Sequence, residues 1–146
     1  NPNPEPYESI VLLVQKEVAE RIVAKPGRTS FGALSVRVQY LAECEMICTV
    51  PAKAFYPPPK VDSAVIRLLP RKREIVAKNP NKLETLVKVG FSAKRKMLRN
   101  NLQSLVEREN LTQLLEKLSV NPQARAEELS VHQWVSLANE LENQDA

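Results

Sequence analysis

The residues best suited to chemistry in this sequence are cations gathered in one short stretch. Lys94, Arg95, Lys96 and Arg99 fall within about one and a half helical turns, and in a helix Arg95 and Arg99 would share a face. Such a helix could lay its basic side along the phosphate backbone of a nucleic acid. A solvated basic face is the competing interpretation, and the spacing alone does not decide between the two.

Two adjacent aromatic residues, Phe55 and Tyr56, form a second candidate. They precede three consecutive prolines at 57–59, which stiffen the backbone and remove hydrogen-bond donors. Rigid aromatics at the end of a strand can stack on nucleobases, which is worth about 1–3 kcal/mol per base. Taken by itself, the pattern favours a simpler interpretation, in which Phe55 is a core residue and the prolines shape a loop.

Several other kinds of site are excluded or poorly supported. His132 is the one histidine and lies far from both cysteines, so neither a multi-histidine metal site nor a Cys-His or Ser-His-Asp set can be assembled. Cys44 and Cys48 lack a second cysteine pair, and we expect two small buried hydrophobic residues in a reducing compartment. The three glycines have no phosphate-cradling spacing, so no G-x-G-x-x-G or P-loop motif occurs.

The composition is that of a globular chain with an uneven charge distribution. The 146 residues are 43% hydrophobic and 26% charged, and the longest apolar run, 10–14, is too short to cross a membrane. The net charge of +4 hides 12 basic and 3 acidic residues in 60–100, followed by 3 basic and 8 acidic residues in 101–146. A central block this basic favours a polyanionic partner such as RNA or DNA.

The first elements that would position these residues are strands and one helix. The continuous apolar run 10–14 indicates a strand buried on both faces of a parallel sheet, and a helical period follows from Lys16 to Pro26-Gly27. The stretch 32–43 fits a strand and a helix equally well. Two short strands, 46–50 and 63–69, flank the proline-rich segment and are expected to pair antiparallel.

After Pro70 the pattern becomes polar and then helical, which indicates a boundary between two units. Four apolar stripes at helical spacing predict helices around 83–87, 97–106, 111–118 and 131–138. We expect Asn81 to cap the first of them, and Ser130 with Gln133 to form a capping box at the start of the last. Trp134 is expected in the core.

Five segments of the sequence occur, in the same order, in the KsgA family of small-subunit rRNA adenine dimethyltransferases, which is related to the Erm methyltransferases. These segments are VQKEVAERIVAKPG, FGALSVRVQYLAE, VPAKAFYPPPKVDSAVIRLLPR, FSAKRKMLRNNL and RAEELSVHQWVSLANEL. The motifs are long and specific, and they extend over about residues 7–141. The chain therefore resembles this family over nearly its whole length.

The resemblance implies an α/β fold in two parts. Residues 1–72 would be the C-terminal part of a class I, Rossmann-like methyltransferase sheet, and 73–146 a small all-α rRNA-binding domain. The segment 32–43 would be a helix packed on the sheet. Members of the family use S-adenosylmethionine to dimethylate two adjacent adenines near the 3′ end of 16S rRNA, and each base is flipped into the pocket.

The same resemblance implies the partners and the compartment. The partner would be 16S rRNA in the small ribosomal subunit, with a role in subunit assembly, and no metal or membrane would be involved. We expect a monomer in the cytoplasm, or in an organellar stroma or matrix.

The sequence departs from the family pattern at the catalytic centre. It contains no N-L-P-Y tetrapeptide, which in the family aims the adenine amine at the methyl group. The glycine-rich cofactor loop and the acidic ribose-binding residue are missing too. We therefore expect a C-terminal portion with no catalytic or cofactor-binding residues of its own, inactive when alone.

The residues that carry over from the family are few. Phe55 matches the phenylalanine of an F-x-P-x-P motif, which resembles a stacking face for the flipped adenine, and Lys60, Asp62 and Ser63 continue that motif in structural roles. The expected rRNA contacts are Lys94, Arg95, Lys96, Arg99, Arg71, Lys72 and Arg73.

Two other functions stay open on the sequence. The chain could be a non-catalytic RNA-binding or ribosome-assembly module that uses only its basic block. It could also be a helix-turn-helix DNA-binding protein built on residues 82–105. A preference for structured RNA over duplex DNA would argue against the DNA-binding alternative.

Overall fold

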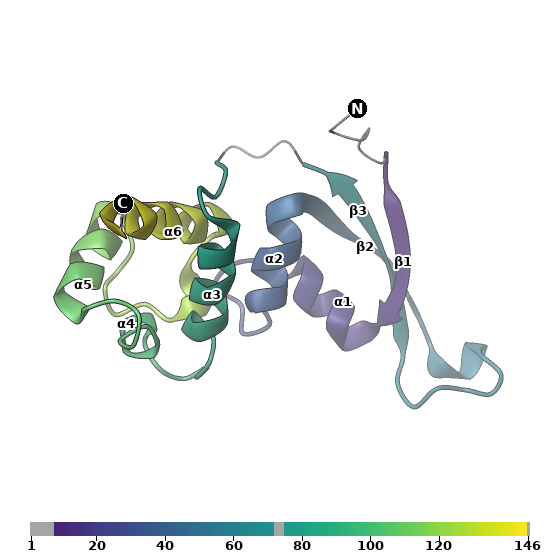
Figure 1. Ribbon diagram of the computed structural model, residues 1–146. Coiled ribbons are helices and arrows are strands. Elements are labelled where there is room, and N and C mark those ends of the chain that lie inside the picture. Colours follow the sequence, from purple (N-terminus) through teal and green to yellow (C-terminus); the bar gives the residue numbers. More distant parts are fainter. Residues whose placement is uncertain (1–7, 72–74, 146) are drawn as a thin grey trace.

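The computed structural model describes residues 8–71 and 75–145, which form a small sheet and a group of helices beside it (Figure 1). In chain order the elements are β1 (Ile10–Gln15), α1 (Lys16–Val23), α2 (Ala33–Leu41), β2 (Ala42–Val50), the 3-10 helix η1 (Ala52–Ala54), β3 (Ser63–Pro70), α3 (Pro80–Gly90), α4 (Leu98–Asn101), α5 (Arg108–Lys117), the 3-10 helix η2 (Ala126–Glu128) and α6 (Val131–Asp145). Helices α3 to α6 gather at one end and the sheet lies at the other, with α1 and α2 between them (Figure 1). The arrangement is α/β, as expected.

The sheet has three strands in the order β1-β3-β2, and both pairings are antiparallel. The predicted pairing of 46–50 with 63–69 is confirmed, although β2 begins earlier, at Ala42. The expectation that 10–14 is buried on both faces of a parallel sheet is wrong for this structure. Strand β1 is an edge strand, and Val11 and Leu13 are 61% and 54% exposed because no described helix covers their face of the sheet.

Helices α1 and α2 lie on the opposite face of the sheet. Ala19 and Ile22 of α1 are buried against Ala64 and Ile66 of β3. The expectation that 32–43 is a helix packed on the sheet is confirmed by α2, in which Val38 packs against this sheet core.

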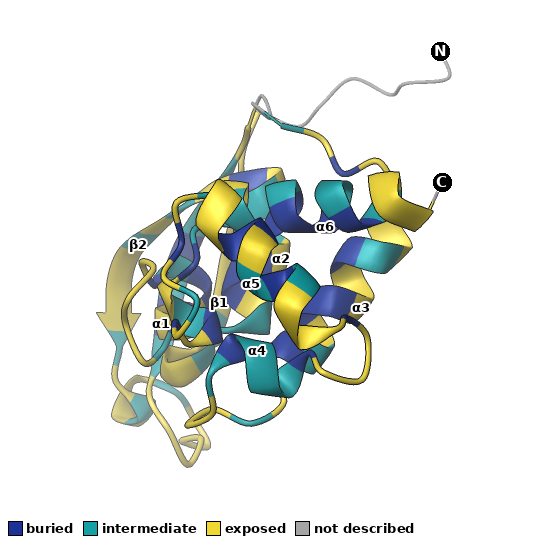
Figure 2. Cartoon of the chain, turned by 90° about the vertical axis from the view of Figure 1, so that its left-hand side faces the viewer, coloured by how far each residue is buried: buried dark blue, intermediate teal, exposed yellow. Residues whose placement is uncertain are grey.

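A second core lies among helices α3 to α6. Trp134 of α6 is completely buried there, as predicted. Other large side chains that are completely buried in this core are Leu86, Leu98, Leu102, Leu111, Leu115, Leu129 and Leu137. Phe31 and Val36, which precede the expected boundary at residue 72, pack in this core as well. Figure 2 shows the buried residues along the inward sides of these helices.

Two predicted helix caps have different outcomes. The capping box is confirmed, because the Gln133 N–H donates to Ser130 Oγ at 3.1 Å and the Ser130 N–H donates to Gln133 Oε1 at 2.9 Å. The expected cap Asn81 is wrong. Helix α3 begins at Pro80, and Asn79 caps it by accepting the Lys82 N–H at 3.2 Å. Proline is favoured at the first helical position, where its missing N–H would have no partner anyway.

No helix within residues 8–71 and 75–145 combines the length and the apolar character that a membrane span requires.

Candidate nucleic-acid interface

Residues 91–97 form the turn between α3 and α4, and we call them the cation loop because Lys94, Arg95 and Lys96 lie in it. The expectation of a basic helix here is wrong: only Leu98–Asn101 is helical, so Arg95 and Arg99 do not share a helical face. All three loop cations are exposed. Among the described residues none of the three forms an ion pair, which leaves their charges available to an outside anion.

Contacts with the chain beyond it hold the cation loop in place. Asn101 Nδ2 donates to the carbonyls of Gly90 and Ala93, both at 2.9 Å. The Leu98 N–H donates to the Ala124 carbonyl at 2.8 Å, and the Leu98 side chain is fully buried. Hydrogen bonds to residues outside the loop therefore hold the backbone that carries the three cations.

Arg99 differs from the three loop cations. It lies on α4 and is half-buried, and its Nε atom is buried without a hydrogen-bond partner in the described part of the chain. The shielded stem restricts where the guanidinium can reach. Arg99 can therefore extend a contact made by the loop cations, but it is less free than they are to follow a phosphate.

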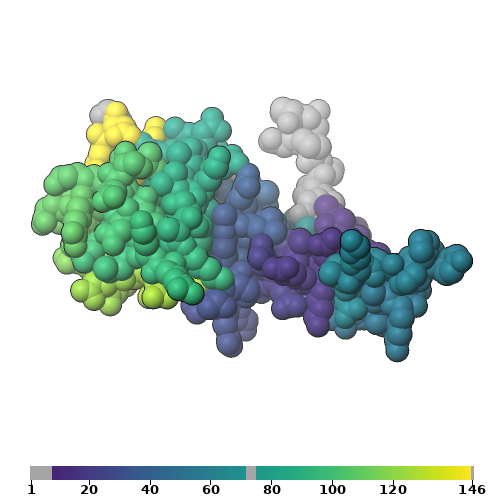
Figure 3. Space-filling view, turned by 90° about the horizontal axis from the view of Figure 1, so that it is seen from below, coloured from purple at the N-terminus to yellow at the C-terminus, as the bar shows by residue number. Residues whose placement is uncertain are grey.

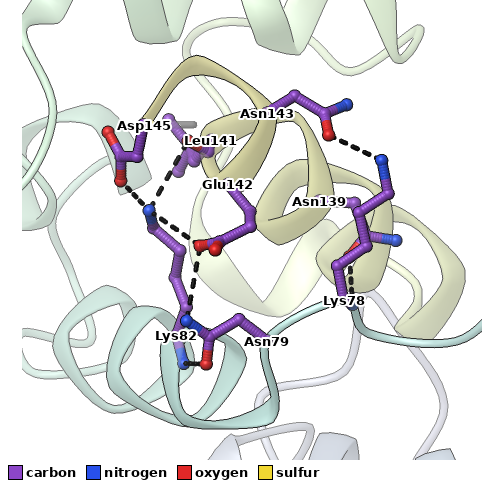
Figure 4. Close-up of polar contacts among 8 residues, drawn as sticks. All are labelled: Lys78, Asn79, Lys82, Asn139, Leu141, Glu142, Asn143 and Asp145. Carbon is purple, nitrogen blue, oxygen red and sulfur yellow. Dashed lines mark hydrogen bonds and ion pairs between the residues drawn. The ribbon is translucent and has the colours of Figure 1, made fainter.

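Several cations elsewhere in the described chain are neutralised by nearby acids. Arg37 pairs with Glu84, Arg67 with Glu45, and Lys117 with Glu140. Figure 4 shows how Lys82 of α3 lies between Glu142 and Asp145 near the end of α6, with 3.3 Å separating its Nζ from Glu142 Oε2. The acidic C-terminal block thus offsets the charge of Lys82, while the cation loop keeps its charge.

The proline-rich segment is a loop that joins β2 to β3, and we call residues 51–62 the hairpin loop. Phe55 is half-buried and belongs to neither core, so the interpretation of Phe55 as a core residue is wrong. Tyr56 beside it is fully exposed. The base of the loop is closed by Asp62, whose carboxylate accepts the Ala52 N–H at 2.9 Å and whose carbonyl accepts the Lys16 N–H at 3.0 Å.

The remaining expected rRNA contacts lie near the end of β3. Arg71 is exposed there, and its N–H donates to the Leu41 carbonyl at 3.3 Å. Lys72 and Arg73 lie outside the described residues. The structure thus describes five of the expected contact positions, which lie in two separate parts of the chain.

A pocket of about 510 Å³ lies between the two ends of the molecule, and the sequence did not predict it. It is bounded by α1, by the segments 29–34 and 90–94, and by the start of η2. Lys94 borders it, as do Arg21 and Glu17, which form an ion pair at 2.7 Å. Four segments far apart in sequence form its wall, so no local motif could have revealed it.

The cysteines do not form a site. Cys44 is half-buried, and burial raises the pKa of its thiol while the nearby Arg71 lowers it in part. The expectation that both cysteines are buried is wrong for Cys48, which is exposed. An irregularity between Met46 and Cys48 shifts the register of β2, so the two cysteines face different surroundings. Among the residues that the structure describes, no three His, Cys, Asp or Glu side chains could jointly hold a metal ion.

The positions of the glycines show whether these residues could hold S-adenosylmethionine. Such donors and related nucleotides bind on a glycine-rich turn that follows a parallel strand. Gly27 and Gly32 lie between two helices instead, and a Cβ on Gly90 would meet Trp134 at 2.6 Å. The described residues therefore do not fit this cofactor.

The sequence matches the ribosomal RNA adenine dimethylase family over residues 3–143. The chain is 75% identical over 141 residues to a protein of Nostoc punctiforme called ribosomal RNA small subunit methyltransferase A, and 71% identical to that of Trichormus variabilis. The alignments cover 97% of this chain but 49% and 52% of those proteins. The chain thus spans about half the length of the curated relatives that it matches.

Solved structures of two rRNA methyltransferases resemble this fold. A dimethyladenosine transferase from Plasmodium falciparum superposes with a TM-score of 0.80 at 24% identity, over 99% of this chain and 60% of that one. The 23S rRNA methyltransferase ErmE gives a TM-score of 0.65 at 26% identity, over 92% of this chain and 55% of that one. The expected fold class, part of a Rossmann-like methyltransferase followed by helices, is confirmed.

Proposed function

The chain belongs to the ribosomal RNA adenine dimethylase family, and we propose that it is the RNA-binding part of an enzyme that dimethylates two adjacent adenines near the 3′ end of 16S rRNA. The family match over residues 3–143 carries the proposal. The three unpaired cations of the ordered cation loop support it, since an RNA-modifying enzyme must hold phosphates. The methyl donor would be S-adenosylmethionine.

We assign the described residues to binding and orientation of the RNA. Lys94, Arg95 and Lys96 would contact phosphates, and Arg99 and Arg71 would extend that contact. Phe55 would stack on the flipped adenine, which must leave its helix before its exocyclic amine can be reached. The half-buried setting of Phe55 supports this role, because part of its side chain stays accessible to a base.

A two-part organisation belongs to the proposal. Residues 1–72 would continue the sheet of a cofactor-binding half, and 73–146 would form the rRNA-binding domain. Two observations support this organisation. The outer edge of β1, on the side away from β3, has no strand partner in the described chain, and Val11 and Leu13 are exposed. Such an edge is a template for further strand pairing. We also propose a monomeric enzyme that acts during small-subunit assembly, in the cytoplasm or an organelle.

The test compares two triple variants that remove the same charge. One variant is Lys94→Gln, Arg95→Gln, Lys96→Gln; the control is Arg37→Gln, Arg67→Gln, Lys117→Gln, in which the lost cations are already ion-paired. Fluorescence anisotropy would measure binding to a hairpin from the 3′ end of 16S rRNA between about 50 and 200 mM salt, a range over which phosphate contacts change affinity steeply. We expect the first variant to bind more weakly, with a salt slope smaller by about 2, since each contact contributes roughly 0.7.

Equal binding by both triple variants would contradict the RNA-contact assignment. The donor assignment has a separate test. Isothermal titration of the 146-residue chain with S-adenosylmethionine should show no binding, and tight binding would contradict our placement of the donor site outside these residues.

A second candidate function is a non-catalytic RNA-binding or ribosome-assembly module. One observation favours keeping it: the cation loop is ordered by contacts within the helical group and needs no cofactor site. Mass spectrometry of 16S rRNA for dimethyladenosine distinguishes the two. The DNA-binding alternative is not favoured, because α4 has four residues, too few for a recognition helix in a major groove.

A further inference from the structure

The hairpin loop projects from the end of the sheet, away from both cores (Figures 1 and 3). Asp62 closes its base, and the Ala54 N–H donates to the Pro51 carbonyl at 3.0 Å within η1. Three prolines at 57–59 restrict the backbone further. A projecting segment held in this way loses little conformational entropy when it binds a partner.

Tyr56 lies on this projection with its side chain wholly in solvent. It is 100% exposed, whereas the next most exposed large hydrophobic residue, Val11, is 61% exposed. Within the described part of the chain, the aromatic ring contacts join Phe31, Phe91 and Trp134 and do not involve Tyr56. Packing inside this chain therefore does not account for an aromatic residue at this position.

Phe55 and Tyr56 are adjacent but differ in exposure. The chain bends at residues 55–57, and Phe55 is half-buried there whereas the Tyr56 side chain is wholly exposed. The Tyr56 ring is therefore accessible independently of the Phe55 ring and offers a second aromatic face.

The charges around Tyr56 fit a nucleic acid. Lys53 and Lys60 are exposed on the same loop, and neither forms an ion pair with any residue the structure describes. Asp62 is the one acid of the loop, and its carboxylate is engaged at the base by the Ala52 N–H. An aromatic side chain between lysines is the combination that binds single-stranded RNA through stacking and phosphate contacts.

The hairpin loop also lies on the same side of the molecule as the cation loop. In Figures 1 and 2 the hairpin loop and the turn between α3 and α4 both reach the lower edge, one at the sheet end and one at the helical end. An RNA laid along this side could contact both loops.

We propose that Tyr56 stacks on an unpaired nucleotide of the RNA other than the base at Phe55, with Lys53 and Lys60 on neighbouring phosphates. This inference rests on the proposed function, because RNA is the partner in both. It adds a stacking residue and a second phosphate-binding loop to the site.

The experiment measures RNA affinity and the environment of Tyr56 in parallel. The complete 146-residue chain would be labelled with 3-fluorotyrosine, and the fluorine resonance of Tyr56 assigned with Tyr56→Phe. The half-buried Tyr40, whose hydroxyl accepts the Ala77 N–H at 2.9 Å, serves as the internal reference. The probe is the 16S rRNA hairpin with its unpaired loop, compared with a fully paired duplex of the same length.

We expect the Tyr56 resonance to shift on addition of the hairpin and not of the duplex. Tyr56→Ala should weaken hairpin binding by roughly 5- to 150-fold, the range for loss of one base–aromatic stack, whereas Tyr56→Phe keeps the ring and should stay within about twofold. Val61→Ala, on the same loop and half exposed, is the matched control and should not change affinity. Thermal unfolding of the two Tyr56 variants should be unchanged, since the Tyr56 side chain has no packing to lose.

The outcomes separate the two proposals. If Tyr56→Ala binds RNA with wild-type affinity while the triple variant of Lys94, Arg95 and Lys96 still loses binding, this inference is overturned. The proposed function is then unaffected. The inference is also overturned, in favour of a protein partner, if the fluorine resonance of Tyr56 does not shift on addition of RNA but does shift on addition of a proline-rich or acidic peptide. A wild-type chain that is folded by circular dichroism and binds no RNA overturns both.

Discussion

Asn79 and Asn81 lie two positions apart, and only one of them caps α3. Asn79 accepts the Lys82 N–H, whereas Asn81 is an exposed residue inside the first turn. We expect Asn79→Ala to lower the free energy of unfolding by about 1 kcal/mol, because an orphan N–H loses its acceptor. Asn81→Ala, the matched control, should leave it nearly unchanged. Urea unfolding followed by circular dichroism measures both, and equal effects would contradict this cap.

Gly90 of α3 lies directly against Trp134 of α6. A Cβ there would lie 2.6 Å from the Trp134 ring and 3.0 Å from Leu98 Cδ1, and both side chains are fully buried. Gly90→Ala should therefore destabilise the chain by about 1–3 kcal/mol through overpacking. Combining it with Trp134→Phe tests the cause, since the smaller ring leaves room for the methyl group. A penalty that is the same in both backgrounds would point to another origin.

The two cysteines should differ in reactivity with pH. Burial raises the pKa of the Cys44 thiol, so less of it is thiolate at about pH 8, and access to it is restricted too. Iodoacetamide should therefore modify the exposed Cys48 first, and Cys44 should become reactive as the pH rises toward its elevated pKa. Mass spectrometry of Cys44→Ser and Cys48→Ser isolates each rate, and faster modification of Cys44 at the lower pH would count against this assignment.

At the scale of elements, the cation loop depends on one side chain. Asn101 donates to two carbonyls, and replacing it with alanine leaves Gly90 and Ala93 without those donors. Asn101→Ala should speed hydrogen exchange in residues 91–97 and weaken RNA binding, since disordered cations lose more entropy on binding. Asn100→Ala is the adjacent control, because its side chain makes no hydrogen bond within the described residues. Unchanged exchange would show that other contacts order the loop.

The elements differ in how far the sequence could predict them. Helices α5 and α6 follow from leucines and a tryptophan at helical spacing, and the α6 cap follows from Ser130 and Gln133. Helix α2 could not be assigned from its own pattern, because Val36 and Val38 serve two cores on opposite sides. Helix α4 does not extend back over Lys94–Lys96. The Leu98 N–H donates to the Ala124 carbonyl and Asn101 donates to the Gly90 and Ala93 carbonyls, and no local window contains the Ala124 contact.

The candidate site residues could be proposed from the sequence, but their backbone structure could not. Charge alone singles out Lys94, Arg95 and Lys96, and the F-x-P-x-P motif singles out Phe55, and their roles stay predictions. The backbone conformation of the three cations depends on contacts with residues outside the motif, so a helix was expected where a loop occurs. The pocket beside Lys94 could not be predicted, because its wall is formed only when segments far apart in the sequence come together.

At the scale of the whole molecule, the exposed face and edge of β1 should control association. Val11 and Leu13 are the apolar residues concerned. We expect the chain alone to self-associate, and Val11→Lys with Leu13→Lys to reduce this in analytical ultracentrifugation. The same variant should fail to form a complex with the half of the Nostoc punctiforme relative that this chain does not match, which the unmodified chain should bind. Val76→Lys, another exposed apolar position, is the control and should alter neither result.

Helix α2 has a mechanical consequence for RNA recognition. Val36 is buried with the helical group and Val38 packs against the sheet core, so α2 connects the two ends of the molecule. The hairpin loop belongs to one end and the cation loop to the other. The distance between a nucleotide stacked on the hairpin loop and phosphates bound at the cation loop would then be set by this connection. The chain would bind those RNAs whose folded shape matches that distance.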